Sequence, residues 1–296
     1  MSLPRIAALQ MVSTNSIDEN LVVAERLIAE AAKAGATLVV LPETFALFGA
    51  HVQQTLGQQE ATGHAVVRPF ICEQAKRWKI WIVAGTIPVA PTPATPCPKE
   101  KPLTTTAASE RVFSSCFVVN DKGEECARYD KMHMFDVEVA DQQGRYRESD
   151  TFLAGDHVVV VDTPVGRLGL AVCYDIRFPE LFRVMFSRGV DLIAVPSAFT
   201  LLTGEAHWLP LLRARAIENQ CYIIGANQGG AHSSSRSTSG GSAIIDGWGN
   251  VLAEAARGEA CIVAEINLDK QSQQRRAMPI NQHLRFTVLS KETSKQ

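Results

Sequence analysis

Apolar and polar residues follow two different periods that alternate along the chain. Segment 18–34 carries apolar side chains at helical spacing and is followed by Gly35, which is typical of a helix end. The continuous apolar run 37–41 has the length of a strand buried on both faces of a sheet. By these criteria, helices are predicted over 18–34, 63–78, 179–188 and 205–219. Strands are predicted over 6–10, 37–41, 80–87, 112–120, 125–129, 158–162, 167–173, 191–195, 221–226, 242–246, 250–255 and 259–266.

This alternation of strands and helices is typical of an α/β fold, and the many hairpins favour two mixed sheets packed face to face with helices outside. No internal repeat and no shift in composition divides the 296 residues, so we expect one domain spanning 1–296. Segment 89–108, rich in Pro, Thr and Ala, and segment 233–242, rich in Ser and Gly, are predicted to be loops.

Composition narrows the function classes. Hydrophobic residues make up 46% and charged residues 20%, a balance that supports a large core. A net charge of -2 gives no overall field for nucleic acid or an anionic membrane, so we expect neither as a partner. The seven cysteines are scattered without a C-x-x-C pair, which argues against a disulfide framework and a zinc site. With no signal-peptide pattern and no apolar run of about 18 residues, we predict a cytoplasmic protein.

Cys173 is the sharpest candidate for chemistry, because it stands where a predicted strand gives way to the helix that starts at Pro179. At such a turn, unpaired backbone N–H groups and the positive end of a helix dipole favour the thiolate. The alternative at this point is an inert buried cysteine. The histidines have no metal-ligand spacing and no persuasive surroundings as a base for this thiol.

Three charged residues occupy places similar to that of Cys173. Glu43 follows the strongest predicted strand, Lys131 follows the strand ending at Tyr129, and Glu148 precedes the next strand pair. Functional groups of α/β sheets collect beyond the carboxyl ends of strands. Each residue alone is equally compatible with a solvated loop position.

Three blocks then make the prediction specific. Leu41–Glu43, Tyr129–His133 and Val172–Glu180 resemble the signature blocks of the nitrilase (carbon–nitrogen hydrolase) superfamily, in the same order and at similar separations. The resemblance covers about residues 4–286 and is greatest to the Nit branch of amidases. It implies a four-layer αββα sandwich, with a core over about 4–270 and a C-terminal extension, 271–296, at a subunit interface of a homodimer or larger assembly.

The resemblance also implies roles. Glu43 would be the general base, Cys173 the nucleophile and Lys131 the cation that stabilises the developing oxyanion, with the backbone N–H of Tyr174 assisting. Glu148 would hold Lys131 and orient substrate or water.

Substrate contacts are implied for three residues. Arg177 matches a position that contacts a substrate carboxylate in related carbamoylases, although a structural salt bridge with Asp175 or Glu180 stays open. Phe199 and Thr200 are predicted to form a pocket wall.

We therefore predict an amidase that hydrolyses a small ω-amide through a cysteine thioester, with deaminated glutathione as substrate and acid and ammonia as products. The alternative is an ω-amidase acting on α-ketoglutaramate or α-ketosuccinamate. A nitrile hydrolase and a non-catalytic binding protein are the remaining alternatives. The chain lacks a P-loop, a dinucleotide fingerprint and a Cys/His cluster, so we expect no cofactor and no metal.

Overall fold

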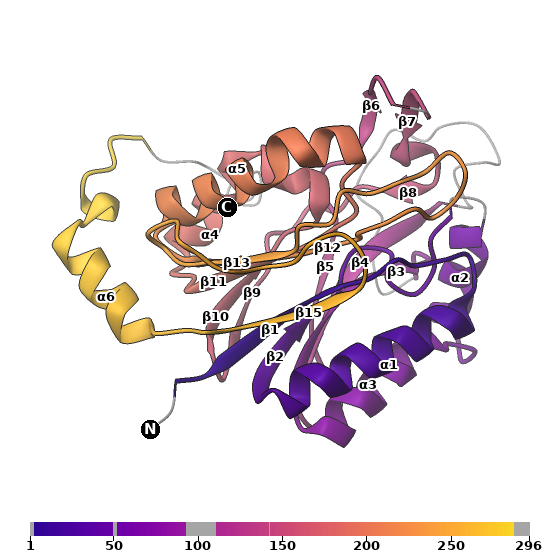
Figure 1. Ribbon diagram of the computed structural model, residues 1–296, viewed down its shortest axis with the longest axis horizontal. Helices are drawn as coiled ribbons and strands as arrows, with labels where there is room; N and C mark the ends of the chain where they lie inside the picture. The colour runs from indigo at the N-terminus through magenta and orange to yellow at the C-terminus, as the bar shows by residue number, and fades with distance from the viewer. Residues whose placement is uncertain (1–2, 50–51, 93–110, 142, 287–296) are drawn as a thin grey trace.

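Two β-sheets packed face to face form the centre of the molecule, and helices cover the outer face of each (Figure 1). The structure, a computed structural model, describes residues 3–49, 52–92, 111–141 and 143–286. Most of the predicted loop 89–108 therefore lies outside the described residues. The layers confirm the predicted αββα sandwich.

The first sheet has seven strands, with β8 paired to β4 at the side of the path β15–β1–β2–β3–β4–β5. Its strands are β1 (Arg5–Gln10), β2 (Ala36–Val40), β3 (Trp81–Val89), β4 (Val112–Val119), β5 (Glu125–Asp130), β8 (Phe152–Leu153) and β15 (Ala260–Glu265). β2 pairs parallel to β3, and two antiparallel pairings then lead through β4 to β5. Because two reversals restore the direction, β2 and β5 end at the same edge of the sheet.

The second sheet has six strands in the order β14–β13–β12–β11–β10–β9. Its strands are β9 (Val160–Thr163), β10 (Gly166–Leu170), β11 (Leu192–Ser197), β12 (Tyr222–Asn227), β13 (Ala243–Ile245) and β14 (Val251–Glu254). β10, β11 and β12 are parallel and so end at one edge. A parallel bridge between Met11 and Gln228, just beyond β1 and β12, brings this edge beside that of the first sheet. A separate hairpin is formed by β6 (Asp136–Glu138) and β7 (Arg145–Arg147).

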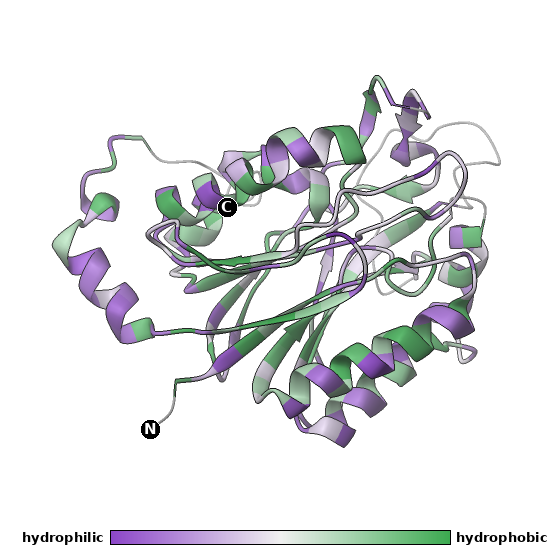
Figure 2. Cartoon of the chain, viewed as in Figure 1, coloured by the Kyte–Doolittle hydropathy of each residue, from purple (hydrophilic) through white to green (hydrophobic). Residues whose placement is uncertain are grey.

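The four central strands of the first sheet, β1 to β4, are buried on both faces, as the apolar run 37–41 predicts. In β1, Ile6 and Ala8 pack in the cluster shared with the second sheet, whereas Ala7 and Leu9 pack with the helical layer outside. Such alternation follows from the two-residue period of a strand. Figure 2 shows the apolar colour concentrated along the strands and on the inner sides of the helices.

The structure describes six helices; the sequence prediction missed those over Gln53–Glu60 and Leu268–Ala277 and differs from the other four mainly at their ends. The six are α1 (Ile17–Lys33), α2 (Gln53–Glu60), α3 (Val67–Trp78), α4 (Pro179–Ser187), α5 (Leu201–Asn219) and α6 (Leu268–Ala277). The predicted start at residue 63 is wrong, because α3 begins at Val67 and has Pro69 in its first turn, where the missing N–H costs nothing. α5 begins earlier than predicted because the Thr200 side chain caps it, accepting from the N–H of Thr203. Among the described helices, none is long and apolar enough to cross a membrane.

Candidate active site

A cavity of about 510 Å³ lies at the edge where the two sheets end. Glu43, Lys131, Glu148 and Cys173 all line it. Glu43 and Lys131 follow β2 and β5 of the first sheet, Cys173 follows β10 of the second, and Glu148 follows the hairpin strand β7. The four residues that the sequence singled out are thus together in one place.

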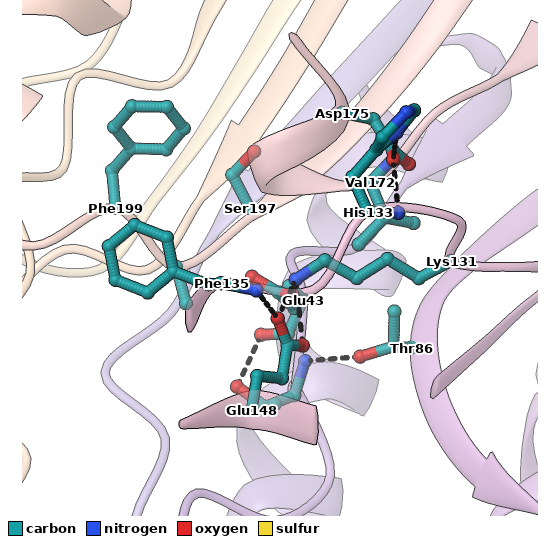
Figure 3. Close-up of polar contacts among 12 residues, drawn as sticks. Glu43, Thr86, Lys131, His133, Phe135, Glu148, Val172, Asp175, Ser197 and Phe199 are labelled. Atoms are coloured by element: carbon teal, nitrogen blue, oxygen red, sulfur yellow. Dashed lines mark hydrogen bonds and ion pairs between the residues drawn. The ribbon is translucent and has the colours of Figure 1, made fainter. Parts of the chain in front are cut away.

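Lys131 is the centre of a buried ion cluster. Its Nζ donates to Glu43 Oε1 at 2.8 Å and to both carboxylate oxygens of Glu148, at 2.8 and 2.9 Å (Figure 3). The Lys131 side chain is almost fully buried. Burial alone would lower its pKa, but the two carboxylates outweigh burial and hold the pKa well above the usual value. Burial raises the pKa of Glu148, against the opposing effect of Lys131.

Cys173 has an uncommon backbone conformation. It is the first residue of a 3₁₀ turn, Cys173–Arg177, and its φ of 49° lies in the left-handed region. Thr44, directly after Glu43, has a φ of 55°. The two other non-glycine residues with positive φ in the described chain, Lys79 and Gln220, end helices α3 and α5. Strained backbone that no helix end explains therefore occurs at the cavity, as it does at many functional sites.

The surroundings of the Cys173 thiol oppose its ionisation. Burial raises its pKa well above the usual value and the nearby Glu43 carboxylate raises it further, whereas Lys131 and the backbone N–H of Ala198 act in the opposite direction. The turn was expected to favour the thiolate, whereas desolvation acts in the opposite direction and is the larger effect. Glu43 is close enough to hydrogen-bond the thiol and can accept its proton.

Two glycines let the chain bring Glu43 and Lys131 this close to the neighbouring backbone. A Cβ on Gly85 would lie 1.8 Å from the carbonyl oxygen of Pro42. A Cβ on Gly155 would lie 2.2 Å from the carbonyl oxygen of Asp130, and the Gly155 N–H donates to the Lys131 carbonyl at 2.8 Å. Gly85 thus supports Pro42, the residue before Glu43. Gly155 supports Asp130, the residue before Lys131, and is hydrogen-bonded to Lys131 itself.

Side-chain contacts also hold the loop that carries Glu43. Gln228 Nε2 donates to the carbonyl of Glu43 at 3.0 Å and to Ser13 Oγ at 2.8 Å. Thr86 Oγ1 accepts from the N–H of Thr44 at 2.9 Å (Figure 3). Gln228 follows β12 of the second sheet, so this contact ties Glu43 to the opposite sheet. Sequence reasoning missed Gln228, because its importance depends on the packing of the sheets.

Asp175 connects the Cys173 turn to the loop after β5. Its carboxylate accepts from the Tyr129 hydroxyl at 2.7 Å and from the backbone N–H groups of His133 and Val172, at 3.1 and 2.8 Å. The carboxylate is completely buried. It fixes the turn that carries Cys173 relative to the segment that carries Lys131.

The predicted substrate-binding residues separate into two groups. Tyr174, Phe199 and Thr200 line the cavity. Arg177 is not among the lining residues. Its guanidinium lies over the rings of Tyr174 and Phe199, with Nη1 3.3 Å from His207 Nδ1. It takes part in none of the ion pairs between described residues. Its role toward substrate stays a prediction.

Several lining residues gave no signal in the sequence. They come from loops and from the β6–β7 hairpin: Phe48, Phe135, Tyr146, Arg147, His232, Ser233, Ser235 and Arg236. Phe135 also positions Glu148, because its N–H donates to Oε2 at 2.6 Å. Within the described ranges, no group of three or more His, Cys, Asp and Glu side chains is arranged to hold a metal ion.

The sandwich, with a buried thiol, a carboxylate and an ammonium in one cavity, is an arrangement that suits hydrolases of C–N bonds. The sequence model of the carbon-nitrogen hydrolase family matches residues 5–276. The chain belongs to this family, which confirms the resemblance seen in the three blocks, and it is a hydrolase acting on C–N bonds other than peptide bonds.

Individual relatives agree with this assignment. The deaminated glutathione amidase of Yersinia enterocolitica is 40% identical over 281 residues, covering 95% of this chain and 93% of the relative. The crystal structure of the Caenorhabditis elegans NitFhit protein superposes with a TM-score of 0.84 at 35% identity, covering 97% of this chain and 68% of that one. A variant of the Nesterenkonia amidase, with an acetamide moiety bound covalently to its active-site cysteine, superposes with a TM-score of 0.73 at 25% identity, covering 96% and 97% of the two chains.

Proposed function

We propose that the protein is a cysteine amidase in which Cys173 attacks the amide carbon and Glu43 moves the protons. The meeting of Cys173, Glu43 and Lys131, all three buried, in one cavity is the observation that carries this proposal. The covalent adduct on the active-site cysteine of the Nesterenkonia relative supports the same nucleophile.

In the first half-reaction, Glu43 takes the thiol proton as Sγ forms a bond to the amide carbon. Lys131 and the backbone N–H of Tyr174 stabilise the negative charge that develops on the carbonyl oxygen. Glu43 then returns the proton to the amide nitrogen, and the C–N bond breaks to leave a thioester. Glu148 holds Lys131 in place through both of its oxygens.

In the second half-reaction, the same carboxylate activates water. Glu43 removes a proton from the water molecule that attacks the thioester carbon, and the proton passes to the departing sulfur of Cys173. The free acid leaves and the thiol is restored. One carboxylate thus serves as base and acid in turn. Glu43 suits both tasks because it is close enough to hydrogen-bond the thiol.

For the substrate we propose deaminated glutathione, which the name of the Yersinia relative supports. The cavity volume of about 510 Å³ lies within the usual range of small-molecule sites. The γ-linked amide of deaminated glutathione is secondary, so an amine departs rather than the ammonia that the sequence analysis expected. An ω-amidase acting on α-ketoglutaramate shares the chemistry and differs in what the cavity must hold.

The test combines one variant with two substrates. Cys173→Ala should abolish turnover and the thioester adduct seen by electrospray mass spectrometry, with an unchanged circular dichroism spectrum. Cys221→Ala, the same change at a buried cysteine outside the cavity, should retain both. Turnover by Cys173→Ala would refute the mechanism. A higher kcat/KM for α-ketoglutaramate than for deaminated glutathione would refute the substrate.

We further propose one domain over 1–296, a homo-oligomer and a cytoplasmic location. Exposed apolar side chains at Trp248, Leu252 and Met278, with a groove between Trp248 and α6, support a subunit interface near the C-terminal extension 271–296. The six cysteines in the described part of the chain are all free thiols, which supports a reducing compartment. Sedimentation of the full chain tests the assembly.

A further inference from the structure

Arg236 is a cation in the cavity whose charge no described carboxylate neutralises through an ion pair. Lys131, whose side chain is buried in the same cavity, is paired twice. Arg236 Nη1 is buried and has no hydrogen-bond partner among the described residues. The charge of Arg236 contributes to lowering the pKa of Asp141. The Asp141 carboxylate, however, accepts its hydrogen bonds from the Tyr146 hydroxyl and from backbone N–H groups, and not from Arg236. A half-buried guanidinium without an ion-pair partner is ready to receive an anion.

The surroundings hold this guanidinium in place before any ligand arrives. It lies 4.7 Å from the ring centroid of Tyr146 and 5.8 Å from that of Phe48. The His232 ring stacks on the Phe48 ring with 3.7 Å between their centroids. The backbone N–H of His232 donates to the Arg236 carbonyl at 2.9 Å. The Arg236 N–H in turn donates to Ser233 Oγ at 3.1 Å. We call Phe48, Tyr146, His232, Ser233 and Arg236 the arginine end of the cavity.

The distance from the arginine end to the thiol is short. Arg236 Nη2 donates to the carbonyl of Ala198 at 3.3 Å, and the N–H of the same Ala198 donates to the Cys173 sulfur. A single residue, which spans about 3.5 Å, therefore separates the two contacts. A molecule attacked at its amide carbon would reach Arg236 with a group only a few bonds away.

A carboxylate is the group that best fits this position. Its two oxygens match the planar donors of a guanidinium, and the Ser233 and Ser235 hydroxyls on the same wall can supply further donors. We propose that Arg236 determines specificity by binding a carboxylate at the far end of the acyl part, so that the enzyme prefers monoamides of short dicarboxylic acids. This inference rests on the proposed amidase function. It gives Arg236 the task that the sequence assigned to Arg177.

The test compares three simple amides with and without the guanidinium charge. Glutaramate carries the carboxylate on its acyl side, pentanamide has a methyl group in its place, and N-pentanoylglycine carries a carboxylate on the amine side. Arg236→Gln should lower kcat/KM for glutaramate by about 10- to 100-fold, mainly through KM, and change the value for pentanamide less than about threefold. Arg236→Lys should recover part of the loss. Arg177→Gln, the matched change at an arginine outside the cavity lining, should leave the preference for glutaramate intact.

Three outcomes would overturn the inference: an equal loss on all amides, a loss confined to N-pentanoylglycine, or a glutaramate-specific loss in Arg177→Gln alone. Failure of the wild type to hydrolyse any amide would count against the proposed function instead. In that case, calorimetry of glutarate binding to Cys173→Ala and to Cys173→Ala/Arg236→Gln decides the question, because binding requires no turnover. Equal affinity of these two variants would refute a carboxylate site at Arg236.

Discussion

The two ends of the cavity differ in how their charges are balanced. At the reacting end, Lys131 pairs with Glu43 and Glu148 and all three are buried or nearly so. At the arginine end, Arg236 is half-buried, is surrounded by aromatic rings and forms no described ion pair. The first end is complete in the free protein, whereas the second is complete only with an anion.

This difference indicates a division of work between the two ends. A cluster whose internal charges are satisfied keeps its geometry whatever amide is present, as preorganised catalysis requires. A cation that is held in place but not neutralised contributes most to ligands that carry the opposite charge. Changes at the reacting end should therefore affect every substrate, and changes at the arginine end should affect anionic substrates alone.

Loss of the Lys131 charge should have the largest effect. Lys131→Met leaves two carboxylates in a buried site without a cation, so we expect kcat to fall by about 10³-fold or more for every amide and unfolding free energy to fall by about 3–5 kcal/mol. The stability loss should be greater at pH 8 than at pH 5, because burial raises the pKa of Glu148 and its protonation at low pH relieves the repulsion. Urea denaturation at the two pH values measures it.

The double variant Lys131→Met/Glu148→Gln is the matched control. Removing one of the two carboxylates should restore part of the stability without restoring activity. A double variant as unstable as the single one would show that lost packing of the lysine side chain, and not charge, explains the effect.

Backbone support at the reacting end comes next in size. Gly155→Ala introduces a methyl group against the Asp130 carbonyl and must displace the segment that carries Lys131. We expect kcat to fall by about 100-fold for anionic and neutral amides alike, since a shift of about 1 Å has that effect on reacting groups. Gly63→Ala, where nothing lies within 4 Å of the added methyl, should behave as wild type. Similar kinetics for both variants would contradict this role of Gly155.

At the arginine end, we expect His232 to make the unfolding free energy depend on pH. Burial lowers the pKa of His232 to about 4, with Arg236 contributing in the same direction. Because the folded protein disfavours the charged imidazole, stability from His232 is full above pH 6.5 and is lost as the pH falls toward 4. The difference in unfolding free energy between wild type and His232→Asn should therefore shrink by about 2 kcal/mol from pH 7 to pH 4. A difference that stays constant over this range would contradict the assignment.

The smallest expected effect concerns the ring under the guanidinium. Phe48→Leu removes the stack with His232 and one aromatic contact of Arg236. KM for glutaramate should rise by about 2- to 10-fold, whereas kinetics on pentanamide should not change. An equal rise in KM for both amides would show that Phe48 supports the packing of the whole cavity and has no specific effect on Arg236. It would also contradict the proposed difference between the two ends.

The reacting end could be predicted from the sequence because its residues follow strands. Strand patterns over 37–41 and 125–129 place Glu43 and Lys131 beyond strand ends, where parallel direction brings them together. Cys173 was found for the same reason, although β10 ends at Leu170 and the thiol begins a 3₁₀ turn instead. Helix α2 was missed because its glutamine-rich segment, Gln53–Glu60, shows no clear apolar period.

The arginine end could not be predicted, because its residues are brought together by loops. Arg236 is one polar residue within a stretch of serines, and nothing in that stretch fixes the direction of its side chain. Arg177 was predicted to bind a substrate carboxylate because of the family resemblance, yet the turn directs it over the rings of Tyr174 and Phe199 and not into the cavity lining. Neighbours in sequence and neighbours in the cavity are different sets wherever the backbone is neither helix nor strand.

The reacting end takes Glu43 and Lys131 from one sheet and Cys173 from the other. β15, which follows all the other described strands in the chain, belongs to the first sheet, so that sheet is complete only after the residues of the second sheet have been made. Until the two sheets pack against each other, the Cys173 thiol lies apart from Glu43 and Lys131. Hydrolytic competence is therefore acquired only when both sheets have formed and packed.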